Sequence, residues 1–70
     1  MPAGMEVSIN GRPHQLAADM TVADAVLLLT SSAAGVAAAL NGEVVRRAAW
    51  SSTALAPGDR VEVLTAVQGG

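Results

Sequence analysis

Two Asn-Gly dipeptides constrain the fold of this 70-residue chain more than any other feature. Asn-Gly is the strongest two-residue signal for a β-hairpin, because a type I′ turn needs positive φ at both central residues. Asn10-Gly11 follows residues 5–9, in which apolar and polar side chains alternate as in a half-buried strand. A two-residue turn then fixes the register, and it predicts the pairs Ile9 with Arg12, Val7 with His14 and Met5 with Leu16.

The second strand of this hairpin is expected at residues 12–16. Pro13 lies inside it, and a proline that cannot donate a ladder hydrogen bond marks the strand as an edge strand. Asn41-Gly42 predicts a second hairpin, in which the apolar run 36–40 pairs with residues 43–45.

A last strand is expected at residues 60–65, after the turn signal Ala56-Pro57-Gly58-Asp59. Val61, Val63 and Thr65 share one face of this strand. The opposite face carries Arg60, Glu62, Leu64 and Ala66. A single exposed leucine such as Leu64 is ordinary on a protein surface, and beside the chain end it is also a candidate contact for a partner.

One helix is expected between the hairpins. Thr21 is a suitable N-cap with an acid three residues on, a variant of the capping box, so the helix should begin at Val22. An apolar stripe at helical spacing follows, and Ser31-Ser32 and Gly35 should end the helix. The stripe consists of Val22, Ala25, Val26 and Leu29. Farther along the chain, Trp50 is predicted to close one end of the core.

The order of hairpin, helix, hairpin and final strand predicts an α+β fold, with one main helix on one face of a sheet. A chain of this length supports one small domain. We place that domain at residues 5–70, with a flexible carboxyl-terminal tail at 66–70 and a disordered leader at 1–4.

Composition excludes several chemistries. With no cysteine and one histidine, the chain has no disulfide, no Cys/His zinc site and no thiol nucleophile. No metal-ligand spacing is present, and a packing or surface role for His14 is favoured over catalysis. The carboxylates fall in caps, turns and outward strand positions, which are typical of solvated charge. Arg46-Arg47 is interpreted as a solvated turn pair, with an anion clamp as the alternative.

The charge balance and the hydrophobic pattern indicate a cytoplasmic protein that binds neither nucleic acid nor membrane. A net charge of −2 opposes phosphate binding. The longest uncharged run, residues 25–42, is interrupted by polar residues and glycine. No basic segment near Met1 precedes an apolar stretch, as it would in a signal peptide.

The chain ends in Gly69-Gly70, which is the most informative feature for function. Residues without Cβ atoms can pass through a narrow channel into the active site of another enzyme and present a carboxylate there. That carboxylate is ionised at neutral pH and can attack the α-phosphorus of ATP to form an acyl-adenylate, which can then accept sulfur. A flexible polar tail or a truncated chain is the alternative interpretation of the two glycines.

Residues 5–70 resemble the ThiS family of sulfur carriers, in the ThiS/MoaD branch of the ubiquitin-like β-grasp proteins. The resemblance depends on a combination of short motifs, each weak alone. They are Asn10-Gly11, Thr21-Val22, Ala39-Leu40-Asn41-Gly42-Glu43-Val44-Val45, Arg47 with Trp50, Gly58-Asp59 and Val67-Gln68-Gly69-Gly70. Arg46 stands where the family often has proline, and residues 1–4 are an extension.

The resemblance implies a β-grasp fold with a mixed sheet of about five strands. It implies that the protein is a co-substrate in thiazole formation for thiamine, and not an enzyme. A ThiF-like adenylyltransferase would use ATP to convert Gly70 to a glycyl adenylate, and a cysteine desulfurase, a sulfurtransferase or sulfide would supply the sulfur. Thiazole synthase (ThiG) would take sulfur from the resulting 1-thioglycine, and no resident cofactor is expected.

Gly70 is therefore the candidate reactive residue and Gly69 its flexible neighbour. The candidate partner-binding residues are Leu64, Ala66, Val67 and Gln68. Three other functions stay open from sequence: a carrier for molybdopterin or cysteine synthesis, a ubiquitin-like modifier of target lysines, and a β-grasp interaction domain. Net negative charge and the absence of lysine speak against a nucleic-acid-binding form of the last.

Overall fold

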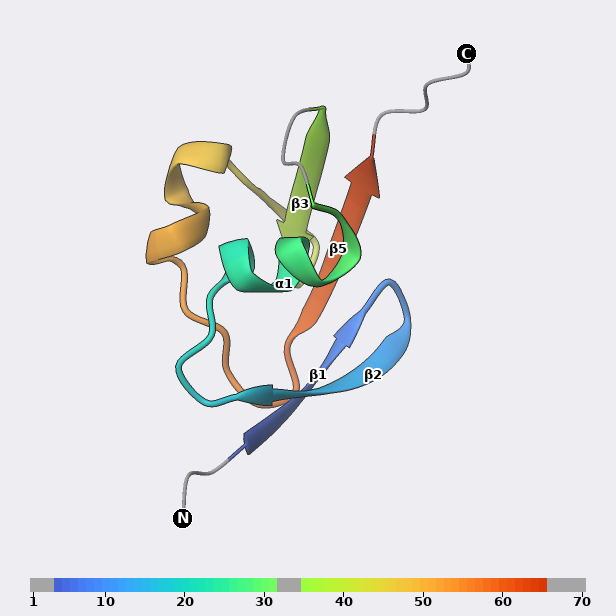
Figure 1. The fold of residues 1–70 in the computed structure, drawn as a ribbon, viewed down its shortest axis with the longest axis vertical. Helices are drawn as coiled ribbons and strands as arrows, with labels where there is room; N and C mark the ends of the chain where they lie inside the picture. The colour runs from blue at the N-terminus through green and yellow to red at the C-terminus, as the bar shows by residue number, and fades with distance from the viewer. Residues whose placement is uncertain (1–3, 32–34, 66–70) are drawn as a thin grey trace.

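The computed structural model describes residues 4–31 and 35–65, which form one five-stranded sheet and a helix packed on one of its faces (Figure 1). The elements are β1 (Gly4–Ile9), β2 (Arg12–Ala17), α1 (Val22–Leu29), β3 (Val36–Leu40), β4 (Glu43–Val45), the 3₁₀ helix η1 (Arg47–Ser52) and β5 (Arg60–Thr65). The strand order is β2-β1-β5-β3-β4, so the last strand lies in the middle of the sheet. β1 and β5 are parallel and the other neighbours are antiparallel. The predicted α+β, β-grasp architecture with a mixed sheet is confirmed.

The first hairpin has the register predicted from its turn. Ile9 pairs with Arg12, and each strand is one residue longer than the alternation indicated, because Gly4 pairs with Ala17. Gly4 therefore belongs to the sheet and not to a leader, whereas residues 1–3 lie outside the described part. In an antiparallel hairpin, hydrogen-bonded and non-hydrogen-bonded pairs alternate, starting with the hydrogen-bonded pair Ile9 and Arg12 next to the turn. Pro13 therefore belongs to a non-hydrogen-bonded pair, and its backbone nitrogen, which carries no hydrogen, faces the outer edge of β2.

The helix begins where the capping box predicts. The Thr21 backbone N–H donates to Asp24 Oδ2 at 2.9 Å, and the Asp24 N–H donates to Thr21 Oγ1 at 3.4 Å. α1 ends at Leu29, and the backbone N–H of the C-cap Thr30 donates to the Val26 carbonyl at 3.1 Å. Among the described residues no helix has the length and apolar character needed to cross a membrane.

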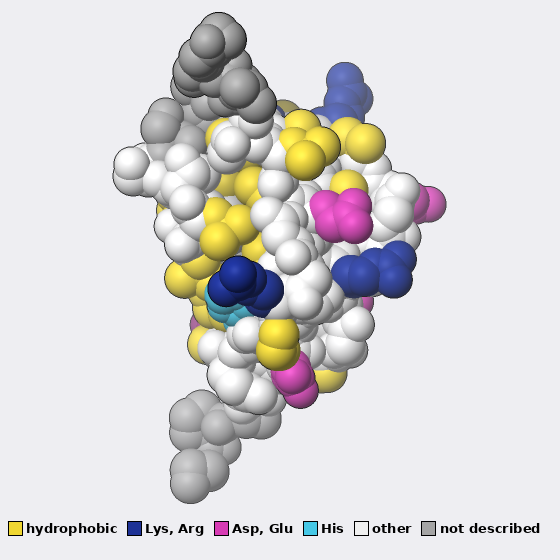
Figure 2. All heavy atoms as spheres, turned by 90° about the vertical axis from the view of Figure 1, so that its right-hand side faces the viewer, with side chains coloured by type: hydrophobic (Ala, Val, Ile, Leu, Met, Phe, Trp, Pro, Cys, Tyr) yellow, Lys and Arg dark blue, Asp and Glu magenta, His cyan; other side chains and the backbone are white. Residues whose placement is uncertain are grey.

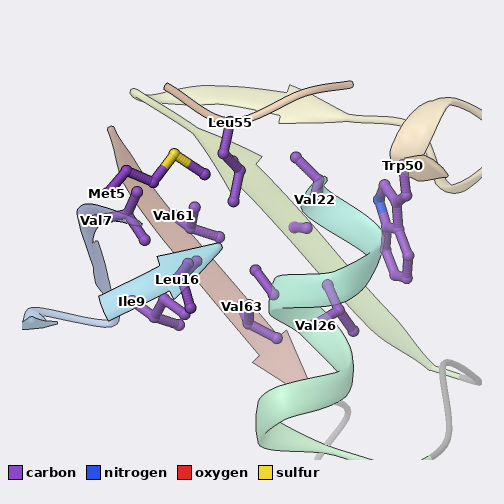
Figure 3. Close-up of a cluster of buried hydrophobic side chains, with 12 residues drawn as sticks. Met5, Val7, Ile9, Leu16, Val22, Val26, Trp50, Leu55, Val61 and Val63 are labelled. Atoms are coloured by element: carbon purple, nitrogen blue, oxygen red, sulfur yellow. The ribbon is translucent and has the colours of Figure 1, made fainter. Parts of the chain in front are cut away.

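The core lies between α1 and the sheet (Figure 3). Valines at 7, 22, 26 and 61 and Ile9 are its largest fully buried side chains. Trp50 is 4% exposed and closes the core beside α1, as predicted, with its Nε1–H donating to the Val45 carbonyl at 2.8 Å. Among the described residues no polar or charged residue is buried, so the packing is wholly apolar.

The segment between β4 and β5 carries a helix that the sequence patterns did not indicate. η1 begins at Arg47, the second residue of the expected turn pair Arg46-Arg47, and it includes Trp50. After η1, backbone hydrogen bonds from Val22 N to Thr53 O at 3.0 Å and from Leu55 N to Met20 O at 3.1 Å join the chain to the start of α1. These bonds hold Leu55 in the core.

Two residues assigned to core-facing positions are exposed. Leu29 lies in the apolar stripe of α1 but is 44% exposed, because it falls in the last turn, where the helix ends. Thr65 shares the face of Val61 and Val63 but is exposed at the last position of β5. Each residue lies at the last position of its element, outside the buried cluster.

Candidate functional site

The candidate site is the carboxyl-terminal end of β5 and the sheet surface beside it. β5 is the central strand, and it leads directly to residues 66–70. The expectations for Ala66, Val67, Gln68, Gly69 and Gly70 concern residues outside the described part of the chain, so they stay predictions.

β5 is held at its beginning by the second Asn-Gly turn. The Asn41 backbone N–H donates to the Arg60 carbonyl at 2.8 Å, and Asn41 Oδ1 accepts from the Arg60 N–H at 2.9 Å. Asn41 Nδ2 also donates to Asp59 Oδ1 at 3.0 Å. The side chain of the turn residue thus continues the hydrogen-bond ladder between β3 and β5.

The first Asn-Gly turn holds the same strand closer to its end. The Asn10 backbone N–H donates to the Val61 carbonyl at 2.9 Å. Asn10 Oδ1 accepts from the Val63 N–H at 2.8 Å, and Asn10 Nδ2 donates to the Val63 carbonyl at 3.1 Å. Sequence analysis identified Asn10 as a turn residue only. The Asn10-Gly11 dipeptide is the sequence signal for the turn, and Asn10 has the positive φ, 53°, that such a turn needs. No local pattern indicates that Asn10 contacts Val63, 53 residues away.

Leu64, the one candidate partner-binding residue that the structure describes, is 70% exposed on the sheet face opposite α1. It is not isolated there. Ala37 lies opposite it on β3, and Ala39 pairs with Val44, which is 78% exposed on β4. We call these four residues the open-face patch.

Sequence analysis missed Val44. The signal was present, because two consecutive valines in a strand cannot both face the core when side chains alternate between faces. Val45 is the half-buried member of the pair and packs against the core, which leaves Val44 in solvent.

Charges of both signs surround these apolar residues. Arg60 and Glu62 share the outward face of β5 with Leu64, and Glu62 lies opposite Ala39. On the side of the molecule shown in Figure 2, acidic and basic side chains are interspersed with hydrophobic ones. On this side of the molecule, the described residues do not form the clustered positive charge that contact with a polyanion would need.

One hollow in the described part of the chain has few chemically active side chains. The best-formed hollow, about 310 Å³, holds Glu6 as its single ionisable side chain, so it contains no acid–base pair. Its lining residues are Glu6, Val7, Ser8, Pro13, Pro57 and Gly58. No group of three His, Asp or Glu side chains in the described ranges is arranged to hold a metal ion. His14 is half-buried opposite Val7, a position consistent with packing.

Comparison with known proteins gives a family for this fold and chain end. The model of the ThiS family matches residues 7–70. The chain belongs to the ThiS family. The chain is similar to the crystal structure of the thiamine biosynthesis protein ThiS from Geobacter metallireducens, with 35% sequence identity and a TM-score of 0.77. The match covers 94% of this chain and 100% of that one. No curated protein matches the chain.

Membership of the ThiS family confirms the resemblance drawn from the short sequence motifs. The match to the ThiS family model includes both Asn-Gly turns, Trp50 and the Gly-Gly end. It supports a role as a small sulfur carrier in thiamine biosynthesis.

Proposed function

We propose that this protein is the sulfur carrier for thiazole formation in thiamine biosynthesis, with the Gly70 carboxylate as its reactive group. The observation that carries the proposal is the Gly69-Gly70 end attached to the central strand of a ThiS-family fold. The chain is then a co-substrate, and the catalytic groups belong to the enzymes that act on it.

The chemistry begins at the carboxylate. A Gly70 oxygen attacks the α-phosphorus of ATP in a ThiF-like adenylyltransferase, and pyrophosphate leaves. Sulfide attacks the acyl carbon and displaces AMP, which gives the thiocarboxylate directly. When a cysteine desulfurase or a sulfurtransferase supplies the sulfur as a persulfide, the attack displaces AMP and forms an acyl disulfide, which a second thiol then cleaves to release the thiocarboxylate and leave a disulfide. The product is the 1-thioglycine thiocarboxylate. Thiazole synthase takes its sulfur, and water restores the carboxylate.

The composition of the chain suits this sequence of steps. With no cysteine, sulfur cannot be held on the carrier as a persulfide, so it resides on the carboxyl terminus. With no lysine, the chain has no ε-amine to capture its own activated acyl group. Arginine supplies all four side-chain positive charges, and its guanidinium is a poor nucleophile.

The deciding experiment is the intact mass of the purified protein before and after incubation with a ThiF-like adenylyltransferase, ATP and sulfide. The expected result is replacement of one oxygen by one sulfur. Deletion of Gly70, or addition of one residue after it, should abolish the change because either alteration moves the carboxylate out of register with the α-phosphorus. Sulfur gain in the lengthened chain would refute Gly70 as the reactive residue.

The open-face patch is the proposed docking surface for the adenylyltransferase. It lies beside the strand that leads to Gly70, so an enzyme that covers Leu64 also receives the tail. Leu64→Asp and Val44→Asp are expected to raise the KM for the carrier about tenfold or more, as expected for charges placed in an apolar contact. Leu28→Asp is the matched control, because Leu28 is 50% exposed on α1, on the other side of the sheet. If all three substitutions raised the KM equally, the open-face patch would not be the docking surface.

The recipient of the sulfur is tested separately. We expect the purified thiocarboxylate form to support thiazole formation by thiazole synthase and to lose its sulfur in that reaction. Transfer to a molybdopterin or cysteine synthase, with none to thiazole synthase, would keep the carrier chemistry and change the pathway. Covalent adducts on lysines of other proteins in a lysate would instead indicate a modifier.

A further inference from the structure

β5 pairs with β3 along one edge and with β1 along the other, and the pairing with β3 extends farther along the strand. On the β3 side, register pairs continue to the last residue of the strand, Thr65. On the β1 side they end at Ile9 and Val61, because the chain turns away from β5 at Asn10. On that side, β5 continues for four residues beyond the last backbone register pair.

The Asn10 side chain replaces the missing strand residue. Its amide accepts from the Val63 N–H at 2.8 Å and donates to the Val63 carbonyl at 3.1 Å, so it satisfies the two backbone groups that two successive peptide groups of a longer β1 would bond. The orientation of the amide follows from the network, because the Val63 N–H requires an oxygen acceptor. The last hydrogen-bonded position on this edge is therefore two residues before Thr65.

We propose that Asn10 is a positioning residue for the carboxyl-terminal tail. This inference rests on the proposed function, in which the tail enters a partner's active site. By holding Val63 on the second edge, Asn10 keeps ordered the end of β5 that precedes residues 66–70 in the chain. A tail whose base is already ordered loses less conformational freedom on binding, so Asn10 favours binding of the carrier. It does not touch the reacting atoms.

The test compares two glycine substitutions. Asn10→Gly removes the side-chain amide and keeps the turn, because glycine adopts the φ of 53° without strain. Asn41→Gly is the matched control. Asn41 has a φ of 51°, also precedes a glycine, and holds β5 through its side chain, but at Arg60, the strand's first residue. Thermal unfolding of both variants verifies that each stays folded and that their stability losses are comparable.

Two measurements then separate positioning from general stability. The first is steady-state adenylation by the ThiF-like enzyme with ATP, with the carrier varied. For Asn10→Gly we expect KM to rise about tenfold, equivalent to about 1.4 kcal/mol, with kcat unchanged. For Asn41→Gly we expect both constants within about twofold of wild type, a difference of under half a kcal/mol. The second is amide hydrogen exchange at Val63, expected to accelerate about tenfold or more in Asn10→Gly only.

Either measurement can overturn the inference. A wild-type KM in Asn10→Gly, an equal KM rise in the two variants, or unchanged exchange at Val63 would each do so. Failure of the proposed function looks different, because the wild-type carrier itself would then not be adenylated. The exchange experiment needs no enzyme, so it still decides whether Asn10 orders the end of β5.

Discussion

Replacement of Trp50 should cost more stability than any other single truncation in this fold. Trp50 is 4% exposed, and its Nε1–H donates to the Val45 carbonyl. Truncation of a buried tryptophan to alanine costs about 3–5 kcal/mol through lost burial and the cavity left behind. At about 0.05–0.15 kcal/mol per residue, a chain of this length has about 4–10 kcal/mol in total. Trp50→Ala is therefore expected to remove about half of the stability.

Trp50→Phe separates the hydrogen bond from the packing. Phenylalanine fills most of the site but cannot donate to Val45, so we expect a loss of about 1–2 kcal/mol. The control is Val44→Thr, a change of similar shape at an exposed position of β4, the strand that also contains Val45. The free energy of unfolding of this control should stay within about 0.5 kcal/mol of wild type. The assay is urea unfolding followed by far-ultraviolet circular dichroism. A loss below about 1 kcal/mol for Trp50→Ala would refute the assignment of Trp50 as the side chain that closes the core.

Three further stability predictions use the same assay. Thr21→Ala removes the N-cap of α1 and should cost about 1 kcal/mol, whereas Thr21→Ser should be nearly neutral; equal losses would rule out the cap. Gly58→Ala should cost about 1–2 kcal/mol, because Gly58 has a φ of 85° and no atom lies within 4 Å of an added Cβ, so any loss is conformational. Val26→Ala should cost about 2 kcal/mol and Leu29→Ala under about 1 kcal/mol, because Val26 is buried and Leu29 is exposed. A larger loss of stability for Leu29→Ala than for Val26→Ala would place Leu29 in the core.

The parts of the fold predicted from sequence are those controlled by neighbours in the chain. Asn10-Gly11 fixes a two-residue turn, and a two-residue turn leaves a single register for the hairpin, which the structure confirms at every predicted pair. The capping box at Thr21 likewise fixes the first residue of α1. In both cases the decisive interactions join residues a few positions apart, so the pattern contains the whole cause.

The parts that were missed depend on distant residues. η1 forms around Trp50, and the surrounding residues, Arg47–Ser52, contain no helical repeat of apolar side chains that could have indicated it. The exposure of Leu29 depends on where the core ends beneath α1, which the helix sequence does not contain. Within the candidate site, Leu64 could be predicted from strand alternation. Its neighbours on β3 and β4 became apparent only with the strand order.

The Asn-Gly turns show how a local motif acquires a second use in three dimensions. A type I′ turn requires positive φ at its first residue, and both asparagine and glycine tolerate it. Glycine would serve the turn alone, but only asparagine adds an amide that can hydrogen-bond to a passing strand. Both turns lie against β5, one at Arg60 and the other at Val63, so the strand that leads to the reactive end is held at two points. Asparagine at both positions is therefore better explained by the need to hold β5 than by the turns themselves.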